Sequence, residues 1–170
     1  MYTYVIIDDE PLIRRGTKKK LEPLSHLLTC CGEASDGREG LELVRQLKPD
    51  IVILDMQMPV MDGTELLPAL SEEFPSTALI VISGYQNFDY MKQAISSKVI
   101  DYILKPFSKD EIQQTVLKTI DSLKDKEAED HHLTSMVQEK EEAFYSLDLK
   151  LLTDFLLGYT DTAHSSVSSL

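Results

Sequence analysis

The sequence predicts an α/β fold, a doubly wound sheet of five parallel strands, and three observations support this class. Short apolar runs alternate along the chain with segments of helical periodicity. The apolar runs are continuous, as is typical of a parallel sheet covered on both faces. Polar residues follow four of these runs directly, and the carboxyl ends of strands in such a sheet line one crevice. We expect the flavodoxin-like strand order and a C-terminal helical extension.

The first predicted strand covers residues 4–7 and ends at the acidic triplet Asp8-Asp9-Glu10. Pro11 follows, and proline is favourable in the first turn of a helix. We expect that helix to end near Pro23. A second strand is predicted over residues 27–31, followed by a turn at 35–37 and a helix whose apolar residues are Leu41, Leu43, Val44 and Leu47.

The third predicted strand, residues 51–54, is entirely apolar and ends abruptly at Asp55. The segment 58–63 contains proline and an Asp-Gly pair, which indicates a loop. A helix is expected after it, because apolar residues recur at helical spacing at Leu66, Leu67 and Leu70.

The fourth predicted strand, residues 78–82, ends at Ser83-Gly84, and a helix carrying Met91, Ala94 and Ile95 is expected next. The fifth strand, residues 99–104, is stopped by Lys105-Pro106. The segment from Ser108 to Glu111 predicts a capping box that starts a final helix. The apolar residues of that helix are Ile112, Val116, Leu117 and Ile120.

Composition excludes several classes of protein. The formal net charge of -12 opposes a large phosphate-facing surface on nucleic acid. The longest apolar runs fall far short of the about 20 residues that cross a bilayer, and the N-terminus lacks the pattern of a signal peptide. We therefore expect a cytoplasmic protein. The adjacent Cys30 and Cys31 would point to opposite faces of a strand, so we expect two buried, reduced thiols.

Three carboxylates, Asp8, Asp9 and Asp55, are predicted to share one pocket with Lys105 and Ser83. Such an acidic cluster is costly unless a cation or a raised pKa relieves the repulsion. Only oxygen donors are available, which favours Mg²⁺ over zinc or copper. A carboxylate can also attack phosphorus, and Asp55 is the best candidate nucleophile. The charge on the phosphoryl oxygens would be neutralised by Mg²⁺, the Lys105 ammonium and the Ser83 hydroxyl.

These motifs resemble the receiver domains of bacterial response regulators over about the first 124 residues. The matching elements are the Asp-Asp-Glu-Pro loop, Asp55 followed by Met-Pro and Asp-Gly, Ser83-Gly84, and the segment 101–107. The resemblance implies a two-component phosphorelay switch rather than a turnover enzyme, with a sensor histidine kinase or a small phosphodonor supplying the phosphoryl group to Asp55.

The resemblance also assigns roles to individual residues. Mg²⁺ would be held by Asp9, Asp55 and the main-chain carbonyl of Gln57, with Asp8 acting through water. Phosphorylation would draw Ser83 toward the phosphoryl group, and Tyr102 would swing inward. We expect phosphorylation to favour a homodimer through the Tyr102 face, the C-terminal helix, or both. The family commonly has Gly-Ala where residues 97–98 are Ser-Lys, and Gln57 and Tyr85 occupy variable positions that influence dephosphorylation.

Three parts are expected along the chain: a receiver domain at 1–124, a helical linker or extension at 125–158, and a Ser/Thr-rich, disordered tail at 159–170. The linker carries apolar residues on an acidic background, and it is read as one helix, a helix pair or a coiled coil. It resembles the linker of response regulators with an AraC-type DNA-binding half. The chain is then either a fragment of a transcription factor whose DNA contact lies elsewhere, or a regulator that works through protein contacts.

Two other functions are compatible with a strand-end aspartate of this kind. A haloacid-dehalogenase-like phosphohydrolase also uses a strand-end aspartate, Mg²⁺ and a lysine, but it needs a second aspartate two positions later as general acid and base. That position is Gln57 in this chain. The other rival is a receiver that is never phosphorylated and serves only as a docking module, against which the intact acidic pair, Ser83 and Lys105 argue.

Overall fold

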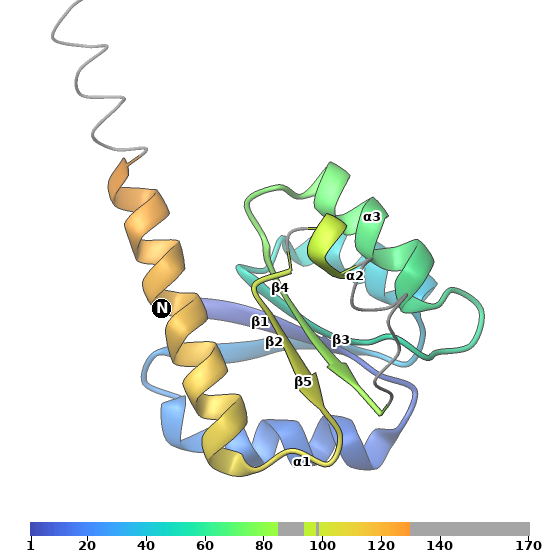
Figure 1. The fold of residues 1–170 in the computed structure, drawn as a ribbon, viewed down its shortest axis with the longest axis horizontal. Coiled ribbons are helices and arrows are strands. Elements are labelled where there is room, and N and C mark those ends of the chain that lie inside the picture. Colours follow the sequence, from blue (N-terminus) through green and yellow to red (C-terminus); the bar gives the residue numbers. More distant parts are fainter. Residues whose placement is uncertain (85–93, 98, 130–170) are drawn as a thin grey trace, which may run out of the picture. The chain divides into compact units, whose positions relative to one another are not determined.

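Five parallel strands form the centre of the fold, in the order β2-β1-β3-β4-β5 (Figure 1). The computed structural model describes residues 1–84, 94–97 and 99–129. The order confirms the predicted flavodoxin-like, doubly wound sheet. The strands are β1 (Tyr2–Ile7), β2 (Leu28–Ala34), β3 (Ile51–Asp55), β4 (Ala78–Ser83) and β5 (Asp101–Leu104).

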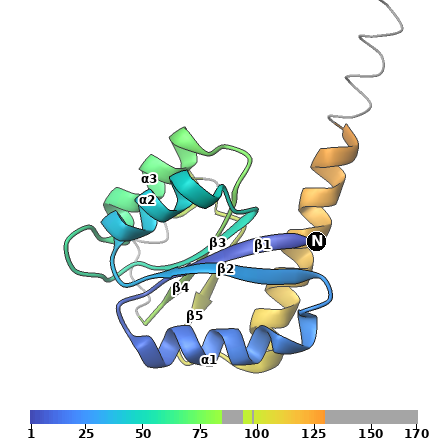
Figure 2. The same cartoon turned by 180° about the vertical axis from the view of Figure 1, so that it is seen from behind.

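Helices cover both faces of this sheet (Figures 1 and 2). One face carries α1 (Pro11–Leu21), the short 3-10 helix η1 (Glu22–Leu24) and the helical segment that starts at residue 109. The opposite face carries α2 (Gly37–Leu47) and α3 (Gly63–Glu73). Because the apolar faces of helices pack against both sides of the sheet, the central strands have no solvent-facing side, which explains their continuous apolar sequence.

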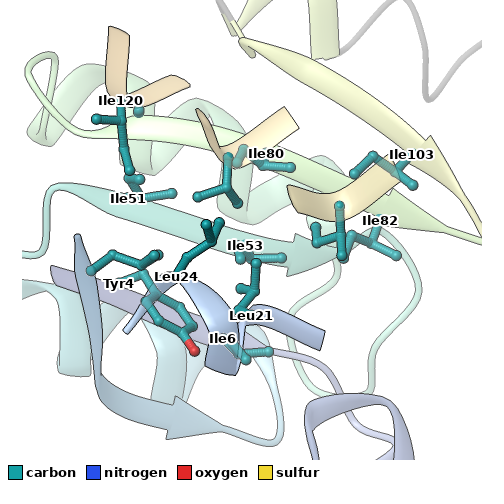
Figure 3. Close-up of a cluster of buried hydrophobic side chains, with 14 of the residues drawn as sticks. Tyr4, Ile6, Leu21, Leu24, Ile51, Ile53, Ile80, Ile82, Ile103 and Ile120 are labelled. Carbon is teal, nitrogen blue, oxygen red and sulfur yellow. The ribbon is translucent and has the colours of Figure 1, made fainter. Parts of the chain in front are cut away.

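Two apolar cores result, one on each face. Figure 3 shows the first, in which side chains of β1, β3, β4 and β5 meet Leu21, Leu24 and Ile120. The second core contains Val44 of α2 and leucines of α3 packed against the alternate residues of the same strands. All residues of β3 and β4 are buried. The sheet therefore holds the carboxyl ends of β3 and β4 in fixed positions.

Side-chain caps define where the helices begin. The carboxylate of Asp36 accepts the main-chain N–H groups of Arg38 and Glu39 at the start of α2. Asp62 caps α3 in the same way. The predicted capping box is also present: Ser108 Oγ accepts the N–H of Glu111 at 3.1 Å, and Glu111 Oε2 accepts the N–H of Ser108 at 3.4 Å.

The predicted end of the second strand was wrong. β2 starts at Leu28 and runs to Ala34, beyond the predicted stop at Cys31, because pairing with β1 shifts register and then continues through Gly32. Gly32 fits because a Cβ there would lie 2.7 Å from Leu43 of α2. The fifth strand also starts later than predicted, at Asp101.

Cys30 and Cys31 pack on opposite faces of the sheet, as the strand geometry predicted. Both thiols are free. They are partly rather than fully buried, because β2 is an edge strand and lacks a neighbour on one side. The expectation of two buried thiols is therefore corrected to two half-buried ones.

Several predictions lie outside the described residues. They are most of the helix expected around Met91, most of the linker at 125–158, and the tail at 159–170. The chain divides into two units, Met1–Leu123 and Lys124–Leu170. Within the residues that the structure describes, none of the helices has the length and apolar character to cross a membrane.

Candidate functional site

The carboxyl ends of three strands bring the predicted site residues together. Ile7 of β1 pairs with Leu54 of β3, so Asp8 and Asp55 follow neighbouring positions of adjacent strands. Lys105 follows directly after β5, two strands away from β3. Residues from three distant parts of the sequence therefore meet at one edge of the sheet, as the strand order requires.

Asp8, Asp9 and Asp55 form a cluster in which one carboxylate oxygen of each lies within 4.8 Å of the others. Asp8 is 2% exposed and Asp55 is 5% exposed, whereas Asp9 is open to solvent. Burying two carboxylates beside each other is unfavourable, because each charge loses hydration and repels the other. This cluster therefore requires cationic partners.

Lys105 supplies one such partner. Its Nζ donates to Asp55 Oδ2 at 2.7 Å and to Asp8 Oδ2 at 2.8 Å, and it lies 3.5 Å from Glu10 Oε1. Burial alone would lower the pKa of Lys105, but the hydrogen bonds and charges of Asp55 and Asp8 outweigh burial and raise it. The ammonium group is therefore fully charged at neutral pH.

Asp8 is held by the main chain and by helix α1. Its Oδ1 accepts the N–H of Glu10 at 2.8 Å, and its carbonyl accepts a hydrogen bond from Arg14 Nη1 at 2.5 Å. Burial raises the pKa of the Asp8 carboxyl, and the negative charge of Asp55 adds to this, against the opposing pull of Lys105. The pKa of Asp8 is therefore shifted toward the neutral form, because the positive charge beside it does not fully offset burial and the charge of Asp55.

The loop after β3 is fixed by close main-chain contacts. Gln57 N donates to Asp55 Oδ1 at 3.3 Å, and Gly63 N donates to the carbonyl of Met56 at 2.9 Å. A Cβ at Gly63 would lie 2.7 Å from the Cα of Met56, so only glycine permits this approach. The packing holds Gln57, whose carbonyl is a predicted metal ligand, next to Asp55.

Ser83 and Tyr102 occupy the neighbouring strands. Ser83 is fully buried at the end of β4, and its carbonyl accepts the N–H of Lys105 at 2.8 Å. Tyr102 of β5 is partly buried against the core on the α2 and α3 face. It lines a cavity of about 210 Å³ together with Ile95. Tyr85 and Lys98 lie outside the described residues.

The donor set fits a hard divalent cation. All three carboxylates present oxygen atoms, and Mg²⁺ and Ca²⁺ are bound by oxygen. Three acidic groups against one ammonium leave room for two further positive charges. Asp8, Asp9 and Asp55 are the residues that could hold such an ion.

Two residues near the site carried no predicted role. Arg14 holds the carbonyl of Asp8, and it also pairs with Glu33 Oε2 at 3.4 Å. No local sequence signal separates Arg14 from its neighbour Arg15, whose Nε lies 3.4 Å from the carbonyl of Pro11. Glu10 approaches Lys105, and its position in the acidic triplet could have indicated this.

The comparisons with known proteins agree with this geometry. Residues 4–117 match the family described as the response regulator receiver domain. An uncharacterized response regulatory protein of Staphylococcus epidermidis is 40% identical over 106 residues, which cover 62% of this chain and 41% of that protein. The transcriptional regulatory protein YesN of Bacillus subtilis is 37% identical over 124 residues, covering 73% of this chain and 34% of that protein.

Solved structures show the same relationship. The receiver domain of AraT, a response regulator from Geobacillus stearothermophilus, is 34% identical with a TM-score of 0.69, covering 74% of this chain and 98% of that domain. The receiver domain of NarL from Mycobacterium tuberculosis is 33% identical with a TM-score of 0.64, covering 72% of this chain and 96% of that domain.

The chain spans less than half the length of the curated relatives named above. The match covers nearly the whole length of the two solved receiver domains. The similarity therefore lies in the part of the chain that contains β1 to β5 and the carboxylate cluster. The chain belongs to the response regulator receiver domain family of two-component systems, whose members act as signalling switches.

Proposed function

We propose that this chain is a Mg²⁺-dependent phosphoacceptor and that Asp55 takes the phosphoryl group. The observation that carries the proposal is the 2.7 Å contact between Lys105 Nζ and Asp55 Oδ2 beside a cluster of two further carboxylates. An ammonium and a candidate cation site, both beside a buried aspartate, suit a group that must accept additional negative charge.

Each residue has a part in the proposed reaction. An oxygen of Asp55 attacks the phosphorus atom of the donor, the new P–O bond forms, and the donor leaves with the electron pair of the broken bond. Lys105 donates to a phosphoryl oxygen, and Ser83 offers its hydroxyl to another. Asp9, Asp55 and the Gln57 carbonyl would hold Mg²⁺, with Asp8 acting through water. The ion would neutralise charge on the phosphoryl oxygens.

The proposed output is a conformational and oligomeric switch. A sensor histidine kinase would supply the phosphoryl group in the cytoplasm. Ser83 would respond to the phosphoryl group, and Tyr102 would move inward, which would reshape the surface that Tyr102 lines together with Ile95. The phosphorylated chain would dimerise through the Tyr102 face, the C-terminal helix, or both. Because relatives such as YesN are transcriptional regulators, we propose control of transcription through a DNA-binding domain outside this chain.

The test is phosphorylation with acetyl phosphate, followed by measurement of the intact mass of the protein. We expect one phosphoryl group per chain in the presence of Mg²⁺ and none with EDTA. Asp55→Asn is the matched variant, because it keeps the shape of the side chain and removes the nucleophile; it should remain unlabelled.

Two results would sink the proposal. Sustained release of phosphate from a generic phosphomonoester would favour a phosphohydrolase of the haloacid dehalogenase kind. If the chain neither accepts a phosphoryl group from acetyl phosphate nor binds beryllofluoride in the presence of Mg²⁺, the result would favour a receiver that serves only as a docking module. Sedimentation with and without beryllofluoride tests the output, and an unchanged mass would contradict dimerisation.

A further inference from the structure

Lys20, in the last turn of α1, contacts the loop that follows β5. Its Nζ donates to the carbonyl of Phe107 at 2.6 Å and lies 4.0 Å from the centre of the Phe107 ring. The ammonium therefore contacts both the main chain and the side chain of one residue. Phe107 is 7% exposed, so its ring is fixed in the core while its carbonyl is fixed by Lys20.

A second hydrogen bond links the same two parts of the fold in the opposite direction. Gln113 Nε2, in the helical segment after the loop, donates to the carbonyl of Lys20 at 2.6 Å. This carbonyl lies at the C-terminal end of α1, where the helix itself provides no donor. The end of α1 and the start of the following helical segment are thus joined by reciprocal contacts on both sides of the 105–108 loop.

The position of Phe107 matters because it lies two residues after Lys105. The main chain of Lys105 is held from one side by its N–H, which donates to the Ser83 carbonyl at 2.8 Å. From the other side it is held by the Lys20 contact at Phe107. Between these two points the Lys105 side chain extends to Asp55 and Asp8.

We propose that Lys20 is a positioning residue for phosphoryl transfer, which holds the 105–108 loop so that the Lys105 ammonium stays aimed at Asp55. The inference rests on the proposed function. Phosphoryl transfer depends mainly on positioning and charge neutralisation, so a small displacement of Lys105 lowers the rate. Lys20 itself touches neither Asp55 nor the acidic cluster, and it acts through Phe107 and the loop.

The test measures the rate of Asp55 phosphorylation by acetyl phosphate at saturating Mg²⁺. A small phosphodonor is chosen because no partner protein then contacts α1. Lys20→Met keeps most of the aliphatic stem and removes both the donor and the cation; we expect the rate to fall roughly tenfold. Lys20→Arg retains a cation that can donate and stack, and it should restore most of the rate.

Lys19→Met is the matched control, because Lys19 is exposed and precedes Lys20 in the sequence. Its phosphorylation rate should stay within about twofold of the wild-type rate, as is usual for exposed positions.

Two further measurements separate positioning from a general loss of stability. The affinity for Mg²⁺, measured by titration, should not be weaker in Lys20→Met than in the wild type, because the three carboxylates are untouched. Thermal unfolding confirms that each variant is folded at the assay temperature. A folded Lys20→Met variant with the wild-type rate would overturn the inference, as would an equal loss of rate in Lys20→Arg. If the wild type itself takes up no phosphoryl group, the proposed function fails instead.

Discussion

The Nζ of Lys105 lies 2.7 Å from Asp55 Oδ2 and 2.8 Å from Asp8 Oδ2, so one ammonium bridges the ends of two neighbouring strands. Asp55 and Asp8 are both buried, and only 11% of the Lys105 side chain is exposed. The bridge thus compensates two desolvated negative charges with one positive charge. Its removal should affect stability as well as chemistry.

Lys105→Met should destabilise the metal-free protein by about 2–3 kcal/mol at neutral pH, because two buried carboxylates lose their cationic partner. Added Mg²⁺ should restore more stability to this variant than to the wild type, since the ion would then be the main positive charge in the cluster. Urea unfolding with EDTA and with Mg²⁺ measures both effects. Lys109→Met, at an exposed position, is the control. Equal metal-free stability of Lys105→Met and the wild type would contradict the prediction.

Val60→Gly should stabilise the protein by about 0.5–1 kcal/mol. Val60 has φ 69° and is 70% exposed, so a β-branched residue occupies the left-handed region without burial to compensate. Glycine removes this strain, although its more flexible unfolded chain offsets part of the gain. Val60→Ala keeps a Cβ and should gain much less. Chemical unfolding measures the free energy of unfolding of the wild type and the two variants. If Val60→Gly is no more stable than Val60→Ala, the backbone at Val60 is not strained.

Thr17→Val should raise stability by about 1 kcal/mol. Thr17 is 1% exposed on the inner side of α1, and its Oγ1 has no hydrogen-bond partner among the described residues. Valine has nearly the same shape and removes the buried hydroxyl. Thr17→Ser keeps the hydroxyl and loses the methyl group, so it should be less stable than the wild type. A loss of stability in Thr17→Val, measured by unfolding in urea, would show that the hydroxyl is satisfied.

Tyr4→Phe should remove a loss of stability at alkaline pH. Burial, followed by the nearby Cys30 thiol, raises the pKa of Tyr4 far above its ordinary value of 10.0. The unfolded chain then loses this proton at lower pH than the folded protein does. Tyr4 therefore contributes stability that is complete below pH 10 and declines as the pH rises above it.

The measurement for Tyr4 is the difference in unfolding free energy between the wild type and Tyr4→Phe from pH 8 to 11. Cys30 and Cys31 also have raised pKa values because of burial, and they are present in both proteins; only the interaction between Cys30 and the Tyr4 hydroxyl differs between the two. The wild type should lose stability relative to the variant only above about pH 10. A difference that stays constant over this range would show that the Tyr4 hydroxyl is not protected from ionisation.

Local patterns in the sequence were sufficient for the fold class. The apolar runs that became β3 and β4 are buried at every position, and the Ser108 and Glu111 capping box lies where it was predicted. The end of β2 was not predictable in this way, because Gly32 reads as a turn residue and lies within the strand only through pairing with β1 and packing under Leu43.

Local patterns predicted the alternation of strands and helices and the positions of Asp8, Asp55, Ser83 and Lys105 at strand ends, because these features depend on neighbours along the chain. Three features emerge only in the folded protein: one ammonium bridges Asp8 and Asp55, Lys20 holds Phe107, and Val60 has a left-handed backbone. Such features depend on the pairing of strands that are far apart in the sequence and on the paths of loops across the sheet, and hydrophobic periodicity within one segment does not fix either.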